Sequence, residues 1–497
     1  MTFLREPERQ TPIIATPDVL VAGAGPAGIG AAVAAARNGA SVLLVERYGF
    51  LGGNLTIAMV NPMFTFHDIQ GRQVIRGVAG ELVDRLVEHT DSLGHVRDLT
   101  FDNASMTPFD PEGMKNILFR MVREAGVQLL LHTWVVDAVT EGDRVTHIIV
   151  ENKSGRQAIQ PKMIIDCSAD ADIVAKAGAP FVKGRESDGM MQPVTLFFRI
   201  GDVNDTNLRA WMKQNRELLK DSPSDAEIDG SQAIAFLGLQ SLIKQAVARG
   251  EFPADAAPRI LLYQLPRKGQ VAVNTTRLQG IDGTNADDLT RAEYLTREQA
   301  WQIHRFLKTY VGGFEDSYIL DTGVQVGVRE TRHIVGDYTM TEDDVLGGRA
   351  FADGIACGTF AIDIHPPEGE KQIYTGSGKA VYEIPYRACL PQGLNNLYVA
   401  GRSISATHAA FGSARVMATA MGIGQGIGTA AALAVKNGQT NREVDVAVVR
   451  RMLLAQGQYL LNTEADVVQD AGLTLETSTR STAEAGHFNP FQNQPKK

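Results

Sequence analysis

Three glycines near the start of the chain have the spacing of a phosphate-binding turn. Gly23, Gly25 and Gly28 form the pattern G-x-G-x-x-G within VAGAGPAGIGAAVAAARNGASVLLVER. In such a turn the first glycine permits the bend, the second lets the backbone approach a diphosphate, and the third allows close helix–strand packing. The N–H groups at the start of the following helix then face the phosphates. The spacing predicts a dinucleotide site, and a glycine-rich packing turn is the alternative.

The residues on either side of this turn supply the context that a dinucleotide site requires. DVLVAG is an apolar run typical of a buried parallel strand, and AGIGAAVAAARNG predicts a helix that ends at Asn38 and Gly39. A second apolar run, SVLLVE, closes with Glu46, whose carboxylate suits the ribose hydroxyls of an adenosine. We therefore expect the turn, with Pro26 and Ala27 at its helix start, to hold the ADP half of a dinucleotide.

The choice between NAD and FAD needs further signals, because both cofactors use this turn. The unit lies at the start of the chain and continues into RYGFLGGNLT. There Gly52, Gly53 and Asn54 would let a loop pass close to a flavin or its phosphates. We find no second G-x-G-x-x-G after a convincing strand, so a separate pyridine-nucleotide domain is not expected. FAD is the favoured cofactor.

Two histidines are candidates for the proton chemistry that accompanies flavin-dependent oxidation. A base must take the heteroatom proton while a C–H bond faces flavin N5. His408, in ISATHAAFG, lies between a predicted strand and a long helix, where it could act as an acid or base or could simply hydrogen-bond its loop. His365, in AIDIHPP, precedes two prolines, and for this residue structural anchoring is favoured over catalysis.

Three arginines are candidates for contacts with anions. Arg402 directly follows the strand-end Gly401 and is placed to touch cofactor or substrate. Arg329 and Arg332, in GVRETRH, could bind a substrate carboxylate in bidentate fashion. An ion pair with an acid such as Glu330 is the favoured alternative. No H-x-x-x-H pattern or carboxylate cluster suggests a metal site.

The first half of the chain contains the elements that would position these groups. VAGELVDRLVEH and PEGMKNILFRMVREAG predict amphipathic helices. The following stretch, as far as DCSADAD, gives short strands broken by Gly-Asp and Ser-Gly turns. We interpret these strands as a β-meander that covers the nucleotide fold and returns to the parallel sheet through MIIDCS.

The second half returns to the sheet and then forms a long helix. LNNLYVAG predicts a buried strand, and RSISATHAAFGSARVMATAMGIGQGIGTAAALAV predicts a loop and a helix with Ser413 as N-cap. Ligands of open α/β sheets gather at the carboxyl ends of strands, so this loop should meet the reacting part of the cofactor. The helix dipole would stabilise a reduced flavin. A membrane helix is the alternative, disfavoured by Arg415, Gln425 and the preceding strand.

The resulting fold class is α/β, with a Rossmann-like FAD-binding domain, a parallel sheet with a β-meander, and an inserted α+β substrate domain. Helices are expected around Ala210 and Ser241, and NREVDVAVVRRMLLAQGQYL predicts a further amphipathic helix. The last twenty or so residues are polar and expected to be mobile. The predicted segments are 1–183 and 317–440 for the two parts of the FAD-binding domain, 184–316 for the substrate domain, and 441–497 for a carboxyl-terminal helix and tail.

Composition narrows the function classes. A length of 497 residues with 44% hydrophobic content predicts two or three domains. The net charge of -9, without a basic stripe, makes nucleic acid an unexpected partner. Three distant cysteines give no disulfide framework or zinc motif, and the amino-terminal segment lacks the apolar core of a secretory signal. We expect a cytoplasmic protein without a membrane span.

Several longer segments carry a family resemblance. They are GFLGGN, DCSADAD, AGAPFVKGRESDGMMQPVTLFFRI, GVRETRHIVGDYTMTEDDVLGGR, AIDIHPP, YEIPYRACLP and the stretch from NNLYVAG to TAAALAV. Together they resemble the FAD-dependent oxidoreductases that are distantly similar to fumarate reductase and succinate dehydrogenase flavoproteins. The resemblance covers nearly the whole chain. It implies cofactor and fold strongly and substrate hardly at all.

The resemblance also implies roles for individual residues. Those implied to hold the ADP half and the adenine are Gly23, Gly25, Gly28, Glu46, Arg47 and the backbone near Val135. Those implied to contact the pyrophosphate and flavin are Gly401, Arg402, Gly412, Val416 and Met417. One segment departs from the family pattern, because Ala169 and Ala171 stand where glycines are usual. Their methyl groups would lie where the backbone approaches FAD.

These observations predict a flavoprotein dehydrogenase or oxidase. It would transfer a hydride between a small polar organic substrate and flavin N5, with FAD held without a covalent link. An unidentified electron acceptor would complete the cycle, and self-association into a homo-oligomer is a further expectation. The alternatives are an FAD-dependent monooxygenase that uses NAD(P)H and a non-catalytic flavin-bound subunit that only transfers electrons.

Overall fold

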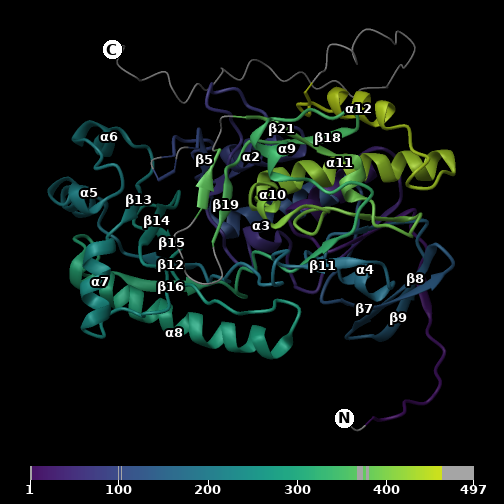
Figure 1. The fold of residues 1–497 in the computed structure, drawn as a ribbon, viewed down its shortest axis with the longest axis horizontal. Coiled ribbons are helices and arrows are strands. Elements are labelled where there is room, and N and C mark those ends of the chain that lie inside the picture. Colours follow the sequence, from purple (N-terminus) through teal and green to yellow (C-terminus); the bar gives the residue numbers. More distant parts are fainter. Residues whose placement is uncertain (1–2, 99, 102, 366–372, 377–379, 462–497) are drawn as a thin grey trace.

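The computed structural model describes residues 3–461 except 99, 102, 366–372 and 377–379. The expected mobile tail therefore lies outside the described residues. Figure 1 shows the helices α2, α3 and α11 between two flanking regions. One region contains the inserted sheet with α5 to α8, and the other contains the meander strands β7, β8 and β9.

A five-stranded parallel sheet forms the centre of the nucleotide fold. Its order is β22 (Leu397–Val399), β10 (Met163–Asp166), β2 (Val19–Ala22), β3 (Val42–Val45) and β6 (Gln128–Leu130). The four residues of β2, β3 and β10 are all buried, which explains their continuous apolar sequences. Helix α1 (Pro26–Arg37) follows β2 and ends at Asn38 and the left-handed Gly39, as predicted. The Rossmann-like α/β prediction is confirmed.

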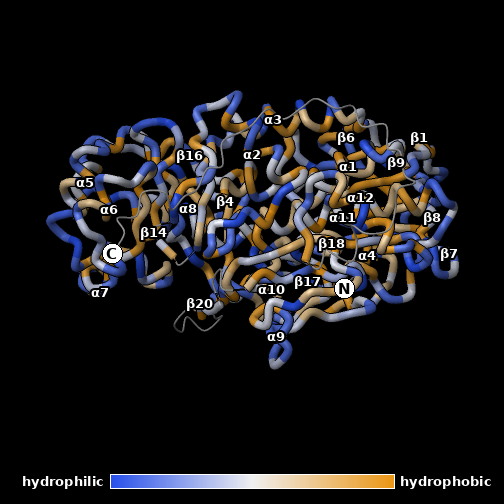
Figure 2. The backbone as a smooth tube through the Cα atoms, turned by 90° about the horizontal axis from the view of Figure 1, so that it is seen from above, coloured by the Kyte–Doolittle hydropathy of each residue, from blue (hydrophilic) through white to orange (hydrophobic). Residues whose placement is uncertain are grey.

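The long apolar helix α11 (Met417–Asn437) packs along α1. A Cβ on Gly424 would lie 2.0 Å from the carbonyl oxygen of Ala27, and one on Gly428 would lie 2.2 Å from that of Ala31. The reciprocal approach is at Gly30 of α1, where an added Cβ would lie 2.2 Å from the carbonyl oxygen of Met421. The length and composition of α11 also fit a membrane span, but 89% of its most apolar window is buried within the protein. Gly424 and Gly428 therefore serve helix packing, and Figure 2 shows hydrophobic residues along α1 and α11.

The remaining elements of the nucleotide fold follow the predicted order. Helices α2 (Val78–His89) and α3 (Pro111–Glu124) occupy their predicted segments. The antiparallel meander consists of β7 (Trp134–Glu141), β8 (Arg144–Asn152) and β9 (Gly155–Ile159), and β1 (Ile13–Ala15) pairs in parallel with β9. Smaller elements are η1 (Gly53–Leu55), β4 (Met63–Phe64), β5 (Met106–Thr107) and α4 (Asp172–Lys176).

The inserted region contains its own sheet and core. The sheet order is β13 (Ala235–Gly238), β14 (Ile260–Gln264), β15 (Val271–Val273), β12 (Phe198–Gly201) and β16 (Tyr318–Thr322). The helices are α5 (Asp205–Gln214), α6 (Asp225–Gly230), α7 (Gln240–Ala248) and α8 (Ala286–Tyr310), with η2 (Arg216–Leu218) between α5 and α6. Because β16 pairs with β12, the inserted sheet extends past the predicted boundary at residue 316. The chain leaves and returns through β11 (Phe181–Lys183) and β17 (Arg332–Ile334), which pair antiparallel.

The segment after β22 differs from the prediction of one capped helix. A separate short helix, α10 (His408–Ala414), precedes α11, and Thr407 is its N-cap. Ser413 is therefore not an N-cap; it lies inside α10, and its hydroxyl contacts Phe360 O and Tyr382 Oη. Helix α12 (Val446–Ala455) is shorter than the predicted residues 441–460. The other elements are α9 (Glu342–Leu346), β18 (Gly354–Gly358), β19 (Ile362–Ile364), β20 (Ile373–Thr375), β21 (Tyr382–Pro385) and η3 (Tyr386–Cys389).

Candidate functional site

Two adjoining cavities lie at the carboxyl ends of the parallel strands. The long cleft has a volume of about 1170 Å³ and the side pocket one of about 970 Å³, and both volumes include the solvent-open entrance. The long cleft begins at the glycine turn after β2, and the side pocket reaches the inserted sheet at β14. Both cavities are lined by Asn54, Val328, Arg402, Arg415 and Met417. A molecule in the long cleft can therefore meet one in the side pocket at these shared residues.

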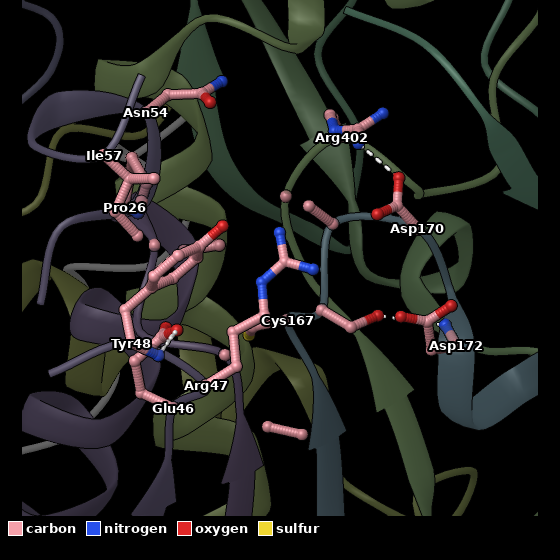
Figure 3. Close-up of a pocket in the computed structure, with 18 of the residues that line it drawn as sticks. Pro26, Glu46, Arg47, Tyr48, Asn54, Ile57, Cys167, Asp170, Asp172 and Arg402 are labelled. Atoms are coloured by element: carbon pink, nitrogen blue, oxygen red, sulfur yellow. Dashed lines mark hydrogen bonds and ion pairs between the residues drawn. The ribbon is translucent and has the colours of Figure 1, made fainter. Parts of the chain in front are cut away.

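The long cleft brings together most residues predicted to bind the cofactor. They come from segments far apart in the chain, and Figure 3 shows several of them around one space. The predicted residues that line the cleft are Gly23, Gly25, Pro26, Ala27, Glu46, Arg47, Gly53, Asn54, Val135, Ala169, Gly401, Arg402 and Met417. The glycine turn, the loop after β3 and the start of α11 thus face one cavity.

Four predicted cofactor residues do not line the long cleft. A Cβ on Gly28 would lie 1.8 Å from the carbonyl oxygen of Gly23, so Gly28 serves helix packing. Gly52 has a φ of 120° and permits the loop to bend. Gly412 packs α10 against β19, where a Cβ would lie 3.1 Å from Asp363 O. Val416 lines the side pocket instead.

The backbone at the start of α1 fits a diphosphate. Gly25 is the N-cap and supplies no side-chain hydrogen bond to the first turn. A Cβ on Gly25 would meet no protein atom nearer than Gly53 Cα, 3.9 Å away. The first N–H groups of α1 consequently remain available, and the helix dipole favours an anion there.

The loop after β3 holds two charged groups in the long cleft. The buried Glu46 carboxylate accepts hydrogen bonds from the backbone of Ala24, at 2.8 Å, and Tyr48, at 3.0 Å. Each carboxylate oxygen has a further lone pair that a ribose hydroxyl can use. The Arg47 guanidinium extends into the cleft (Figure 3). It donates to Gln325 Oε1 at 2.6 Å and lies 5.1 Å from the Trp134 ring.

The alanines that replace the usual glycines have the backbone conformation that glycine favours. Ala169 has a φ of 75° and Ala171 a φ of 51°, both in the left-handed region. Between them Asp170 pairs with Arg402, a contact that Figure 3 marks. Both alanines therefore adopt a conformation that glycine would take without a Cβ penalty, and Ala169 adds a methyl group to the lining of the cleft.

The start of α11 lies where the two cavities meet. Its N-cap, Val416, makes no side-chain hydrogen bond to the helix, and Met417 lines both cavities. A helix N-terminus in this position favours negative charge, as on the pyrimidine side of a reduced flavin. The long cleft therefore fits a dinucleotide along its length, with the flavin end toward the side pocket.

His365 lines the side pocket, and its surroundings favour the neutral imidazole. Its Nε2 lies 3.4 Å from Asp363 Oδ2. Burial, together with the positive charge of Arg329, outweighs Asp363 and lowers the pKa of His365 to about 4. A neutral imidazole beside a carboxylate can accept a proton at neutral pH. The sequence favoured structural anchoring for this residue, whereas the structure places it in the cavity.

His408 lies outside the lining of both cavities. Its Nδ1 is 2.8 Å from Glu330 Oε1, and Nε2 of His333 is 3.1 Å from the same oxygen. Burial alone would raise the pKa of Glu330, but the two histidine hydrogen bonds lower it to about 2. This position favours the alternative in which His408 hydrogen-bonds its loop over the one in which it acts as an acid or base at the flavin. His408 anchors α10 to the loop before β17.

The arginines of GVRETRH have separate positions. Arg332 pairs with Asp172 at 2.9 Å, as the ion-pair alternative predicted. Arg329 lines the side pocket and donates to Pro193 O at 2.6 Å and Thr195 Oγ1 at 2.7 Å. Burial, followed by the positive charge of Arg415, lowers the pKa of Arg329 to about 9.

Several lining residues were not predicted from the sequence. Arg415 had a recognisable signal, because it is a charge within an otherwise apolar helix-forming stretch. Arg259, Tyr263 and Phe64 had none, since only the packing of the inserted region against the nucleotide fold brings them to the side pocket.

The chain belongs to the FAD dependent oxidoreductase family, whose profile matches residues 18–453. It is therefore an FAD-dependent enzyme, and the long cleft is the site that fits the cofactor. A curated relative, the thiamine thiazole synthase of Aeropyrum pernix, is 30% identical over 137 residues. That alignment covers 27% of this chain and 43% of the relative, so the chain matches less than half of the relative's length.

The solved structures that align with this chain have low sequence identity to it. A geranylgeranyl bacteriochlorophyll reductase-like protein from Thermoplasma acidophilum has 12% identity and a TM-score of 0.42, covering 91% of this chain and 90% of its own. The myxobacterial chondrochloren halogenase has 13% identity and a TM-score of 0.46, covering 91% and 84%. The p-nitrophenol 4-monooxygenase of Pseudomonas putida has 12% identity and a TM-score of 0.42, covering 90% and 87%. None of these similarities indicates a substrate for this chain.

Proposed function

We propose that this enzyme is a dehydrogenase or oxidase that transfers a hydride between flavin N5 and a small organic substrate in the side pocket. The observation that carries the proposal is the shared lining of the two cavities. Asn54, Arg402 and Met417 border both spaces, so a substrate carbon there would face the flavin end of the long cleft. We also propose that, within its family, the chain is one of the members distantly similar to the flavoproteins of fumarate reductase and succinate dehydrogenase.

His365 supplies the proton chemistry in the proposed reaction. In the oxidative direction the substrate carbon loses a hydride, and its O–H or N–H proton passes to the neutral imidazole, leaving a C=O or C=N bond. FAD, when bound, accepts the two electrons and the hydrogen of the hydride. Asp363 orients the imidazole and stabilises its protonated form. An electron acceptor then removes the two electrons from the protein.

Anaerobic reduction of the bound flavin tests this function. We expect one or more of a panel of alcohols, amines, hydroxy acids and amino acids to bleach the visible flavin absorbance without NAD(P)H. Bleaching by NAD(P)H alone would instead support the monooxygenase alternative. Bleaching by neither would support the electron-transfer subunit. Either of these results would overturn the proposal.

A matched pair of variants tests the residue assigned to proton transfer. We expect His365→Asn to slow substrate-driven bleaching by about 100-fold or more, because general-base catalysis contributes 10²–10⁴-fold. The oxidised flavin spectrum should remain unchanged. His89→Asn is the control, because His89 ends α2 and lines neither cavity. Equal rates for the two variants would remove His365 from the mechanism.

A further inference from the structure

The charges that line the side pocket are strongly unequal. Among the described lining residues, Asp363 is the one acid, whereas Arg259, Arg329, Arg402 and Arg415 are all cationic. Arg402 pairs with Asp170, and Arg415 lies 3.2 Å from Asp363 Oδ2. The single acid of the pocket is thus already engaged by one arginine.

The Arg329 cation forms no salt bridge to any acid among the described residues. Its hydrogen bonds go to the neutral oxygens of Pro193 and Thr195, and it takes part in no ion pair within the described part of the chain. Largely buried cations are usually paired, because an uncompensated charge in the interior is costly. The side pocket therefore offers a cationic group that an anionic ligand would complement.

Arg415 is a second guanidinium donor that lines the same pocket. Its Nε is buried and has no hydrogen-bond partner among the residues that the structure describes. Its positive charge contributes to the lowered pKa of Arg329, so the two guanidinium groups are electrostatically coupled. An anion between these groups would relieve their mutual repulsion and accept N–H donors from both.

Another part of the side pocket is aromatic. The Phe64 ring lies 5.8 Å from the Tyr263 ring, 5.9 Å from Phe360 and 6.4 Å from Phe101. Phe101 is in turn stacked 4.9 Å from Tyr374. All five rings line the pocket, and they provide flat apolar surfaces on which another ring can pack. A cationic ligand would be disfavoured here, because the same pocket holds four arginines.

We propose that the substrate is an aromatic carboxylic acid, with its carboxylate at Arg329 and Arg415 and its ring among Phe64, Phe101 and Tyr263. This inference rests on the proposed function in taking the side pocket as the substrate site. The carboxylate uses the planar donor sets of the arginines, and the ring replaces water on the aromatic lining. The positive charge of Arg415 would hold the substrate carboxylate near the border with the long cleft, where Arg415 and Met417 line both cavities.

Binding of phenylacetate, an unreactive probe, tests this inference. The FAD-loaded protein is titrated while the visible flavin spectrum is recorded, and calorimetry provides a second readout. We expect phenylacetate to bind at least about tenfold more tightly than 2-phenylethanol or acetate, because it alone engages both parts of the pocket. 2-Phenylethylamine should not compete. Equal or tighter binding of 2-phenylethanol or 2-phenylethylamine would overturn the inference.

Substitution of Arg329 tests whether its positive charge contributes to phenylacetate binding, and the control variant accounts for nonspecific loss of structure. We expect Arg329→Met to weaken phenylacetate binding by at least about tenfold and Arg329→Lys to weaken it less. Arg85→Met is the control, because Arg85 of α2 pairs with Glu81 of the same helix and with Glu124 of α3, and it lines neither cavity. FAD content and circular dichroism verify folding, and Arg415→Met provides a second test if Arg329→Met does not fold. Unchanged affinity in the folded variant would contradict the inference.

The remaining outcomes distinguish this inference from the proposed function. Phenyl phosphate that binds more tightly than phenylacetate would overturn the carboxylate assignment. Flavin bleaching by neutral alcohols without phenylacetate binding would retain the proposed function and overturn the substrate class. Phenylacetate binding without bleaching by any member of the panel would retain the anion site and overturn the proposed function.

Discussion

At the scale of single residues, the position of His365 gives a definite pH dependence. The imidazole has a pKa of about 4 because it is buried near Arg329. It must be neutral to accept a proton, so the oxidation rate is expected to fall as pH drops through about 4. An ordinary histidine would lose this capacity near its usual pKa of about 6.5. Measurement of kcat/KM against pH with the best substrate of the panel would show the difference.

The His365→Asn variant provides the control for this profile. Its residual activity should lack the acidic limb, because the titrating group is absent. An acidic limb near pH 6.5 in the unsubstituted protein would contradict the assigned environment of the imidazole.

The left-handed backbone at Ala169 gives a second residue-scale prediction. Glycine has no Cβ penalty in this conformation, so we expect Ala169→Gly to leave the free energy of unfolding unchanged or to raise it by up to about 1 kcal/mol. Ala175→Gly, within the short helix α4, is the control and should lower it by about 1 kcal/mol. Denaturant unfolding measures both. A clear fall in the free energy of unfolding of Ala169→Gly would contradict an energetic cost of the left-handed conformation for the alanine at this position.

The buried Glu330 carboxylate gives a prediction about stability rather than catalysis. Folding lowers its pKa from 4.5 to about 2, so it stabilises the fold above pH 4.5 and this contribution is lost as pH falls toward 2. Removing His408 leaves that charge less compensated. We expect His408→Gln to destabilise the protein by about 3 kcal/mol while changing flavin reduction less than tenfold. A 100-fold loss of the reduction rate with unchanged stability would restore a direct catalytic role for His408.

At the scale of elements, the crossing of α1 and α11 connects packing to cofactor binding. A Cβ on Gly428 would lie 2.2 Å from the carbonyl oxygen of Ala31, so Gly428→Ala must push the two helices apart. We expect a loss of about 3 kcal/mol in stability and weaker FAD binding, because α1 presents the phosphate-binding N–H groups. Thermal unfolding and FAD retention measure these effects.

Gly80→Ala is the matched control for this prediction. Gly80 is a buried helical glycine of α2, but its added Cβ would meet only Gln73 Nε2, at 3.6 Å. This substitution should leave stability unchanged or raise it, because alanine favours helix. Equal losses of stability in the two variants would contradict a specific steric requirement for glycine at the α1–α11 contact.

Local sequence signals predicted the elements of the nucleotide fold. The strand–turn–helix unit around Gly23 and the helix over Val78–His89 follow from apolar periodicity and glycine position, and both appear where expected. These signals do not indicate α8, the longest helix among the described residues. They also predict one capped helix where the structure has two helices, α10 and α11. Thr407 caps α10 with its hydroxyl, whereas Ser413 uses its own for tertiary contacts that no local pattern reveals.

The candidate site was predictable only on its cofactor side. A glycine turn binds phosphates through its own backbone, so its function can be predicted from the local sequence alone. The side pocket instead forms where β14, the loop before β17, β19 and the start of α11 meet. Arg329 and His365 were recognised as candidates, but the electrostatic coupling of Arg329 to Arg415 depends on tertiary packing.

At the scale of the whole molecule, the long cleft is lined by segments from residue 22 to residue 420. A ligand that bridges these segments must stabilise the folded chain, by about 2.7 kcal/mol at a concentration 100-fold above its Kd. We therefore expect removal of FAD to lower the melting temperature and added FAD to restore it. ADP should restore part of the loss, because it fills only the glycine-turn end. Identical melting curves with and without FAD would contradict the assignment of the cleft.

The most direct test of the central claim is an experimental structure of the FAD-loaded protein with phenylacetate. The account predicts the diphosphate at the start of α1, the isoalloxazine ring beside Asn54, Arg402 and Met417, and the probe in the side pocket with its carboxylate at Arg329. An isoalloxazine ring that lies away from the residues shared by the two cavities would contradict the account.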